Sequence, residues 1–281
     1  MSPIHDQSYR HYAGTRQPVG RAWAVIAGAG VRTMLARRWF VLLLLGAWVP
    51  FIVQAVRFYI VSNIPQGGGF FAVTPQTFRG FLDVQSLFVF FVAVYVGSGL
   101  IANDRRANAL QIYLAKPLLR SEYIGGKLAV LMVFLLLITL VPAIMLVFLH
   151  VMFSGSLAFV RNNLFVLPAI VLGASLQVLI AAVTMLALSS LSKSSRYVAL
   201  LYTGVIMFTK VMFVVLAGIT GSTRLAFISI TANIDQVMDV VFRQTPHYET
   251  PWVVSLLVLL GLLALSVSVL ERRVRGVEIV S

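Results

Sequence analysis

The stretch GSGLIANDRRANALQIYLAKPLLRSEYIGGK, residues 97–127, separates two long apolar segments. Residues 84–103 before its charged part and residues 128–160 after it contain no Asp, Glu, Lys or Arg. Uncharged segments of this length are suited to the hydrocarbon core of a membrane, whereas a charged stretch belongs in water. The chain is therefore expected to leave a membrane here, form a polar basic loop, and re-enter.

The composition agrees with a membrane protein. Of the 281 residues, 59% are hydrophobic and 11% are charged, which is more apolar surface than a soluble domain of this size can bury. The chain contains no cysteine, which excludes disulfides and thiolate–metal sites. The expected class is an all-α integral membrane protein.

Six apolar segments are long enough to cross a bilayer core of about 30 Å as helices. They cover residues 39–60, 84–102, 128–151, 165–189, 197–219 and 251–270. Pro50 predicts a kink in the first, which is tolerated where a neighbouring helix satisfies the freed carbonyl. Residues 1–19 are expected to form a cytosolic tail and residues 20–281 a single transmembrane domain.

The distribution of Lys and Arg predicts the orientation. Sixteen of the 22 basic residues fall on the side that holds both termini, the loop at residues 103–127 and the short loop at residues 190–196. Five fall on the other side, and Lys210 lies within a span. Because cytoplasmic loops are enriched in Lys and Arg, both termini are expected in the cytoplasm. This topology accounts for the net charge of +13 without a nucleic-acid partner.

Two amphipathic helices are expected outside the spans. From Gly20 to Arg38 the apolar residues follow a helical period, which predicts an interfacial elbow helix that contacts membrane lipids. Its apolar face comprises Trp23, Ile26, Ala27, Gly30 and Met34, with Arg21 and Arg32 opposite. Residues 225–243 show a similar period and predict a helix in the outer leaflet or on the bundle. Residues 62–83 predict a flexible outer loop without a chemical constellation.

Nucleotide binding and enzyme catalysis are not expected of this chain. Gly126-Lys127 resembles the end of a phosphate-binding P-loop, but Ser121 occupies the first glycine position and Leu128 the Ser/Thr position. The four histidines are dispersed without the spacing of metal ligands. No catalytic, cofactor-binding or metal residue is assigned.

Three polar residues in the spans are candidates for a transport path. Lys210 is a charge near the middle of its span, so it should face protein, a cavity or water. It is either a contact for an anionic group or a lysine that snorkels or pairs with Asp235 or Asp239. Gln177 and Thr184 either line the same interior or bond between helices.

The basic loop itself predicts a short amphipathic helix at residues 105–115, capped by Asn103 or Asp104 and ended before Pro117. Its apolar side chains share one face with a basic residue: Arg106, Ala107, Leu110, Tyr113 and Leu114. The loop is either a juxtamembrane linker or a docking helix for a groove on a soluble partner.

This loop resembles the permease subunits of type-2 ATP-binding-cassette (ABC) exporters. The shared pattern is P-x-x-R-x-x-Y-x-x-G-K, formed by Pro117, Arg120, Tyr123, Gly126 and Lys127. The resemblance implies a cytosolic coupling helix between spans 2 and 3, a second permease chain as homo- or heterodimer partner, and separate ATPase subunits that hold ATP and Mg²⁺. It also implies a location in the cell inner (plasma) membrane. The ATPase-docking residues implied are Asp104, Arg106, Leu110, Tyr113, Leu114 and Arg120.

Two other functions fit the same segments. A secondary carrier or channel would work without an ATPase, but such proteins usually place several polar or acidic residues at the membrane midplane, where this chain has chiefly Lys210. A membrane anchor would hold soluble partners at the bilayer without transport.

Overall fold

A computed structural model describes residues 22–63, 73–109 and 119–274 of the chain. Within these ranges the structure contains helices and no strands. Six helical segments are long and apolar enough to cross a membrane: Arg38–Ser62, Pro75–Arg106, Arg120–Ser154, Val166–Leu191, Ser195–Thr220 and Trp252–Arg273. The predicted all-α membrane class with six spans is confirmed.

Several spans consist of more than one helical element. The first contains α2 (Arg38–Ala47) and α3 (Val49–Asn63), and the second contains α4 (Pro75–Val92), the π-helical η2 (Ala93–Gly97) and α5 (Ala102–Arg106). The third contains α7 (Arg120–Ile138) and α8 (Leu140–Ser154). Single helices form the others: α10 (Val166–Leu191), α11 (Ser195–Thr220) and α13 (Trp252–Arg273). The remaining elements are α1 (Ala22–Leu35), α9 (Ala158–Asn162), the 3₁₀ helix η3 (Arg224–Ile228) and α12 (Ile230–Val241).

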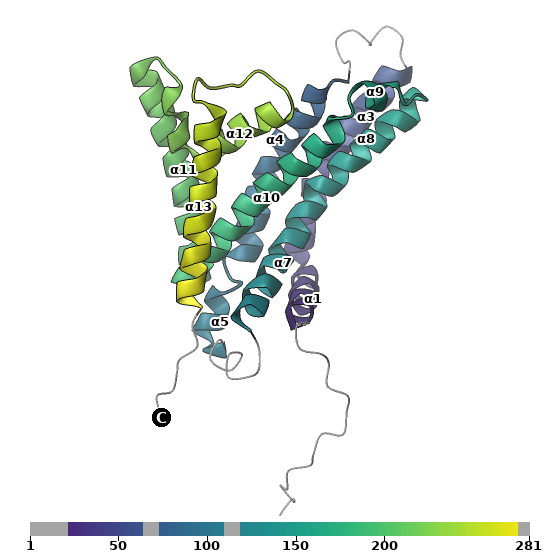
Figure 1. The fold of residues 1–281 in the computed structure, drawn as a ribbon. Coiled ribbons are helices and arrows are strands. Elements are labelled where there is room, and N and C mark those ends of the chain that lie inside the picture. The colour runs from purple at the N-terminus through teal and green to yellow at the C-terminus, as the bar shows by residue number, and fades with distance from the viewer. Residues whose placement is uncertain (1–21, 64–72, 110–118, 275–281) are drawn as a thin grey trace, which may run out of the picture.

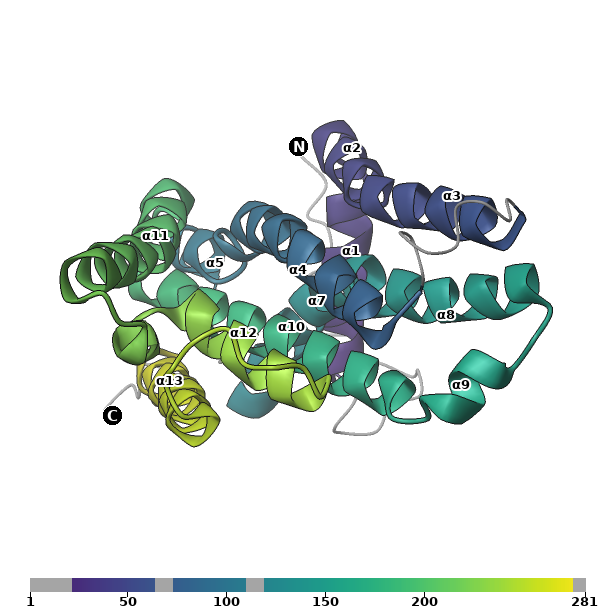
Figure 2. The same cartoon turned by 90° about the horizontal axis from the view of Figure 1, so that it is seen from above.

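Helix α10 is the centre of the bundle (Figures 1 and 2). It contacts α4, α7, α8, α11, α12 and α13. Of its most apolar 18-residue stretch, 61% is buried inside the chain. The corresponding values are 17% for α11 and 22% for α13, which leaves most of their side chains outside the single-chain core. The two peripheral helices therefore present faces to lipid or to another chain.

Two proline-associated breaks occur in neighbouring spans. Pro50 follows the interruption between α2 and α3, and Pro142 follows the one between α7 and α8. A proline has no N–H, so the carbonyl four residues before it loses its helical partner. The Gln85 side chain from α4 donates to the carbonyl of Ile138, four residues before Pro142, and to that of Ala47 at 3.1 Å. The predicted kink at Pro50 is confirmed, and the break near Pro142 was not predicted.

The second span begins earlier than the sequence predicted. Helix α4 starts at Pro75, nine residues before the expected start at residue 84, because Pro75 occupies the first helical turn and Thr74 precedes it in extended conformation. The Thr74 backbone N–H donates to Thr77 Oγ1 at 3.2 Å. The prediction that residues 62–83 are a flexible loop is thus wrong for residues 75–83.

The bundle has two distinct ends (Figure 1). Helices α1 and α5 and the C-terminal end of α13 lie at one end, called the loop end, and α9 and α12 lie at the other, called the α12 end. Residues 225–243 form the predicted helix in two pieces, η3 and α12, separated at Ser229, whose Oγ accepts from the Ala232 N–H at 3.3 Å. Helix α12 rests on the bundle, across α10 and between α4 and α13 (Figure 2).

Candidate functional site at the loop end

Helix α1 packs closely on α7 because two glycines leave room for the neighbouring helix. A Cβ atom at Gly126 of α7 would lie 2.8 Å from Ile26 Cβ and 2.9 Å from the Trp23 carbonyl oxygen of α1. A Cβ atom at Gly30 of α1 would lie 2.6 Å from Val130 Cγ2 of α7. The predicted apolar face of the elbow helix is therefore, at these positions, its contact with α7.

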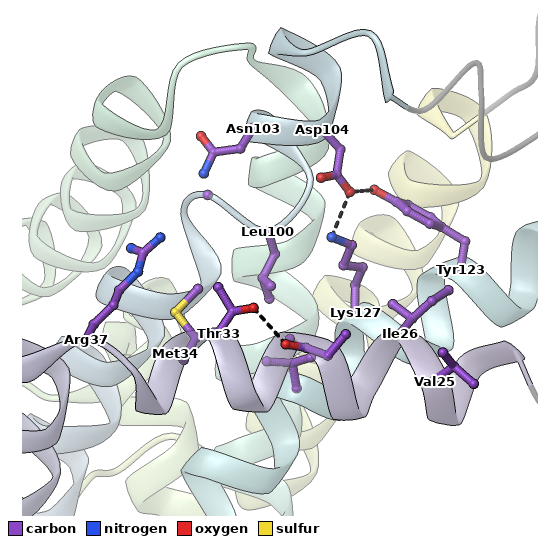
Figure 3. Close-up of a pocket in the computed structure, with 14 residues that line it drawn as sticks. Val25, Ile26, Thr33, Met34, Arg37, Leu100, Asn103, Asp104, Tyr123 and Lys127 are labelled. Carbon is purple, nitrogen blue, oxygen red and sulfur yellow. Dashed lines mark hydrogen bonds and ion pairs between the residues drawn. The ribbon is translucent and has the colours of Figure 1, made fainter.

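Asp104, Tyr123 and Lys127 form a compact group, called the clasp, that joins α5 to α7 (Figure 3). The Tyr123 hydroxyl donates to Asp104 Oδ2 at 2.7 Å, and Lys127 Nζ lies 2.7 Å from the same oxygen. Tyr123 and Lys127 are four residues apart in a helix, so both side chains share one face of α7. Tyr123 is only 1% exposed. The clasp therefore ties the start of the basic loop to the helix that follows it.

Helix α5 is also tied to the end of α10. Ser189 Oγ accepts from the backbone N–H groups of residues 101–102, each at 3.1 Å, and donates to the Ser98 carbonyl at 3.0 Å. The Arg105 guanidinium donates to the Ser190 carbonyl. One serine thus satisfies backbone groups at the transition from the π-helical η2 to α5, and the loop start is connected to α10 as well as to α7.

The predicted capping of the loop helix is wrong. Asn103 and Asp104 lie inside α5, which begins at Ala102, and Asp104 serves the clasp instead. Helix α5 ends at Arg106, and Asn108 adopts a left-handed φ of 52°. A predicted helix over residues 105–115 is therefore interrupted at its start. The remaining docking candidates, Leu110, Tyr113 and Leu114, lie outside the described residues.

A cavity of about 440 Å³ lies between α1, α5 and α7, beside the clasp (Figure 3). Its α1 wall runs from Val25 to Met34 and is largely apolar, and Arg37, which follows α1, also lines the cavity. Leu100 and Asn103 approach from the second span, and Asp104 and Lys127 neutralise each other's charge at one side. The cavity leaves space between the elbow helix and the helix that begins the basic loop.

Arg106 and Arg120 flank the part of the basic loop that is not described. Arg106 is the last residue of α5 and Arg120 the first of α7, and both side chains are exposed. The structure therefore separates the predicted docking residues into two kinds. Asp104 is held within the clasp, whereas the two arginines are accessible to a partner at the loop end.

The three candidate path residues occupy different environments. Gln177 and Thr184 are buried in α10, where Gln177 Oε1 and Thr184 Oγ1 have no hydrogen-bond partner among the described residues. Lys210 lies on an exposed face of α11. Its suggested pairing with Asp235 or Asp239 is wrong, because both carboxylates bind Arg79 instead.

Arg79 is the centre of a charged group at the α12 end that the sequence did not reveal. Its side chain, 4% exposed, pairs with Asp83 of α4 and with Asp235 and Asp239 of α12. The spacing of four residues between Arg79 and Asp83, and between Asp235 and Asp239, is the signal that was available. Because residues 62–83 were predicted to form a loop, the helical spacing of Arg79 and Asp83 was not recognised.

A family model described as ABC-2 family transporter protein matches residues 53–274. No curated protein matches the chain. The matched range contains the clasp, the Arg79 group and five complete spans. The chain belongs to the ABC-2 family of transporter membrane proteins, and it is a multi-pass permease subunit of an ABC transporter, a membrane component of the kind that associates with ABC ATPases.

Proposed function

We propose that this permease works as an exporter with a second permease chain in the cell inner (plasma) membrane, driven by separate ATPase subunits docked at the loop end. ATP and Mg²⁺ would be held by those ATPase subunits. The charge asymmetry supports this orientation, because it assigns the loop end to the cytoplasm. The failure of Ser121 and Leu128 to complete a P-loop supports placing ATP hydrolysis on another chain.

The observation that carries the proposal is the clasp. Asp104 joins both sides of the basic loop, and Ser189 joins the same region to α10. A displacement imposed on the loop by closure of two ATPase subunits would therefore act on α4–α5, α7 and α10 together. Packed helices transmit such displacements as rigid elements.

We place the proposed docking contact at the loop from the end of α5 to the start of α7. Exposed Arg106 and Arg120 would pair with acidic groups of the ATPase, and Leu110, Tyr113 and Leu114 would fill an apolar groove. This division matches common interfaces, in which apolar anchors are surrounded by charged residues.

Copurification tests the docking proposal. We expect Arg106→Glu combined with Arg120→Glu to reduce ATPase recovery at least tenfold in mild detergent, while the permease is still inserted. Leu110→Ala with Tyr113→Ala should have a similar effect. The matched control is Arg161→Glu, an exposed arginine of α9 at the other end of the bundle.

Normal ATPase recovery with both sets of substitutions would reject the docking site. Undiminished transport in ATP-depleted vesicles would reject the ATP-driven exporter and favour a secondary carrier.

The transport path is proposed along the exposed face of α11, between two permease chains. A lysine near the centre of a membrane costs about 2.5–3.5 kcal/mol on insertion scales, so Lys210 should face another chain or water rather than lipid. Lys210 would contact an anionic part of the substrate. Gln177 and Thr184, whose buried oxygens lack hydrogen-bond partners in the part of the chain that the structure describes, would contribute when α10 moves relative to its neighbours.

Substitution of Lys210 tests this path separately from docking. Lys210→Met should abolish transport and leave ATPase recovery normal, and Lys210→Arg should retain transport. Full transport by Lys210→Met would assign the lysine to snorkelling.

A further inference from the structure

The Arg79 group connects two elements that are far apart in the sequence. Arg79 Nε lies 3.0 Å from Asp239 Oδ1, and Arg79 Nη2 lies 3.2 Å from Asp235 Oδ1 and 3.3 Å from the Asp235 carbonyl oxygen. Arg79 and Asp83 belong to α4, whereas Asp235 and Asp239 belong to α12, which crosses the bundle above α10 (Figure 2). The arginine therefore holds α12 against the end of the second span.

The same group carries more negative than positive charge. Three carboxylates surround one guanidinium, which leaves an excess of two negative charges when all three are ionised. His247 reduces this excess when protonated, because its Nδ1 lies 2.6 Å from Asp239 Oδ2. Its backbone N–H also donates to that oxygen at 3.1 Å. Asp239 is fully buried and has partners on both oxygens, whereas Asp235 is partly exposed and its carboxylate pairs with Arg79 alone among the described residues.

Asp235 is a carboxylate whose surroundings favour protonation. Burial, opposed by the Arg79 charge and assisted by repulsion from Asp83 and Asp239, raises the pKa of Asp235 from 3.8 to about 6. Tyr248, in the segment after α12, is also affected: burial and the nearby Asp235 and Asp239 raise its pKa.

The other charged groups near α12 lie outside this arrangement. Arg224 and Glu249 pair with each other at 3.5 Å, and Arg243 stacks on Phe165 with its guanidinium 4.4 Å from the ring centre. Helix α10 contains no charged residue, and Glu271 lies near the distant end of α13. On α11, Lys210 forms no ion pair with these groups within the described residues. The nearby balance of charge thus depends on Arg79, the three carboxylates and His247.

We propose that Arg79, Asp83, Asp235, Asp239 and His247 form a proton-binding latch between α4 and α12. When Asp235 takes up a proton from water, repulsion among the three carboxylates falls and α12 stays fastened to α4. When Asp235 is ionised, the fastened state retains that repulsion, whereas separation of α12 lets water solvate the carboxylate. Release of the proton therefore favours separation at the α12 end. The latch is independent of ATPase docking and of the transport direction.

Distance measurements between spin labels test the latch directly. The chain has no cysteine, so Gln76→Cys on α4 and Thr245→Cys after α12 provide two unique labelling sites on exposed residues. We expect the ratio of separated to fastened protein in liposomes, without ATPase or ATP, to rise by about threefold between about pH 5 and about pH 7.5. Each unit of pKa difference between two states changes their equilibrium tenfold, and partial solvent exposure of Asp235 reduces the full effect.

The Asp235→Asn variant distinguishes the proposed role of Asp235 from other effects of pH. The amide is neutral at every pH and still offers an oxygen to Arg79, so the labelled variant should remain fastened at both pH values. Glu249→Gln, a carboxylate-to-amide change outside the latch, should respond to pH as the unsubstituted labelled protein does.

An unchanged distance distribution between the two pH values in the unsubstituted labelled protein would overturn the proposal. The same pH response in Asp235→Asn would overturn it as well. Because neither measurement requires the partner ATPase, failure of the docking proposal leaves this test intact.

Discussion

The two ends of the molecule use charge in different ways. At the loop end, the clasp sets one carboxylate against one ammonium group and one tyrosine hydroxyl. At the α12 end, the latch sets three carboxylates against one guanidinium. The clasp joins Asp104 to residues 19 and 23 positions away and is neutral, whereas the latch joins residues up to 160 positions apart and carries excess charge. A contact without net charge gains little from separation. A contact with excess negative charge is relieved of repulsion when its parts separate, which agrees with the proposed opening of the latch.

Arg79→Met should produce the largest effect, because it removes the positive charge that pairs with all three carboxylates. Loss of one partner from a buried ion pair destabilises a protein by about 3–5 kcal/mol. We expect strong loss of thermal stability in detergent, with separation of α12 from α4. Arg224→Met is the control, because its ion pair with Glu249 is exposed and should contribute little. Equal stability of the two variants would remove the basis for the latch.

Gly126→Ala should have the next largest effect. The new methyl group would meet Ile26 and the Trp23 carbonyl of α1, and such overpacking costs about 1–3 kcal/mol. Thermal unfolding should show this loss, and ATPase recovery should fall as α1 shifts. Gly125→Ala is a matched control because nothing lies within 4 Å of its Cβ position. The control should gain about 0.5–1 kcal/mol, as expected for alanine within a helix. Unchanged thermal stability of Gly126→Ala would mean that α1 can shift on α7 without cost.

Tyr123→Phe should have a moderate effect at the loop end. It removes the hydroxyl that donates to Asp104 and keeps the buried ring, which isolates one hydrogen bond to a charged acceptor. The expected loss of stability is about 1–2 kcal/mol, toward the low end for such bonds because Asp104 is partly exposed. The loss should be equal at about pH 5 and about pH 7.5. A loss confined to one of these pH values would show that the clasp, too, depends on protonation.

The pH dependence of stability should show the smallest effect. The pKa of Asp235 is raised to about 6 in the folded protein, so the folded state binds more protons than the unfolded state between pH 3.8 and about pH 6. The contribution of Asp235 to stability is therefore present at low pH and is lost as pH rises through this range.

Solvent screening should keep that contribution below about 1 kcal/mol, because the Asp235 side chain is 36% exposed. Thermal unfolding of Asp235→Asn, compared with the unsubstituted protein at each pH, checks this value. The difference between the two proteins should grow in favour of Asp235→Asn as pH rises. A difference that shrinks over this range would reverse the assigned sign.

Local patterns predicted much of the fold. Long uncharged segments identified all six spans, and Pro50 identified the break between α2 and α3. Residues 75–83 were predicted as loop because Gly67–Gly69 and Pro75 suggested one, whereas Thr74 and Pro75 form the start of a helix. Local hydrophobicity shows which segments span the membrane. The residue at which a span begins or ends also depends on capping residues, which hydrophobicity alone does not reveal.

The candidate site was less predictable, because its contacts depend on which helices become neighbours. Tyr123 and Lys127 were recognised as parts of a motif, yet their shared partner Asp104 was interpreted as a helix cap. The partners of Arg79 on α12, Asp235 and Asp239, lie more than 150 residues away, and no spacing rule within one helix connects them to Arg79. Asp235 and Asp239 were instead considered as partners of Lys210. Local patterns single out individual residues, whereas the tertiary packing of the helices determines their partners.

Gln85 gives the two broken spans a common pivot. By linking the Ala47 and Ile138 carbonyls, it fixes α2–α3 and α7–α8 to each other at the places where each helix loses its continuous hydrogen bonding. Helices α2 and α3 contain 10 and 15 residues, so the lever arm beyond the pivot is about one and a half times as long as the one before it. A tilt of the span about this point moves the α3 tip farther than the end nearest the basic loop. In the proposed ATPase-driven mechanism, the position of Gln85 along the span would set the ratio between the displacement at the loop end and the displacement at the α3 tip.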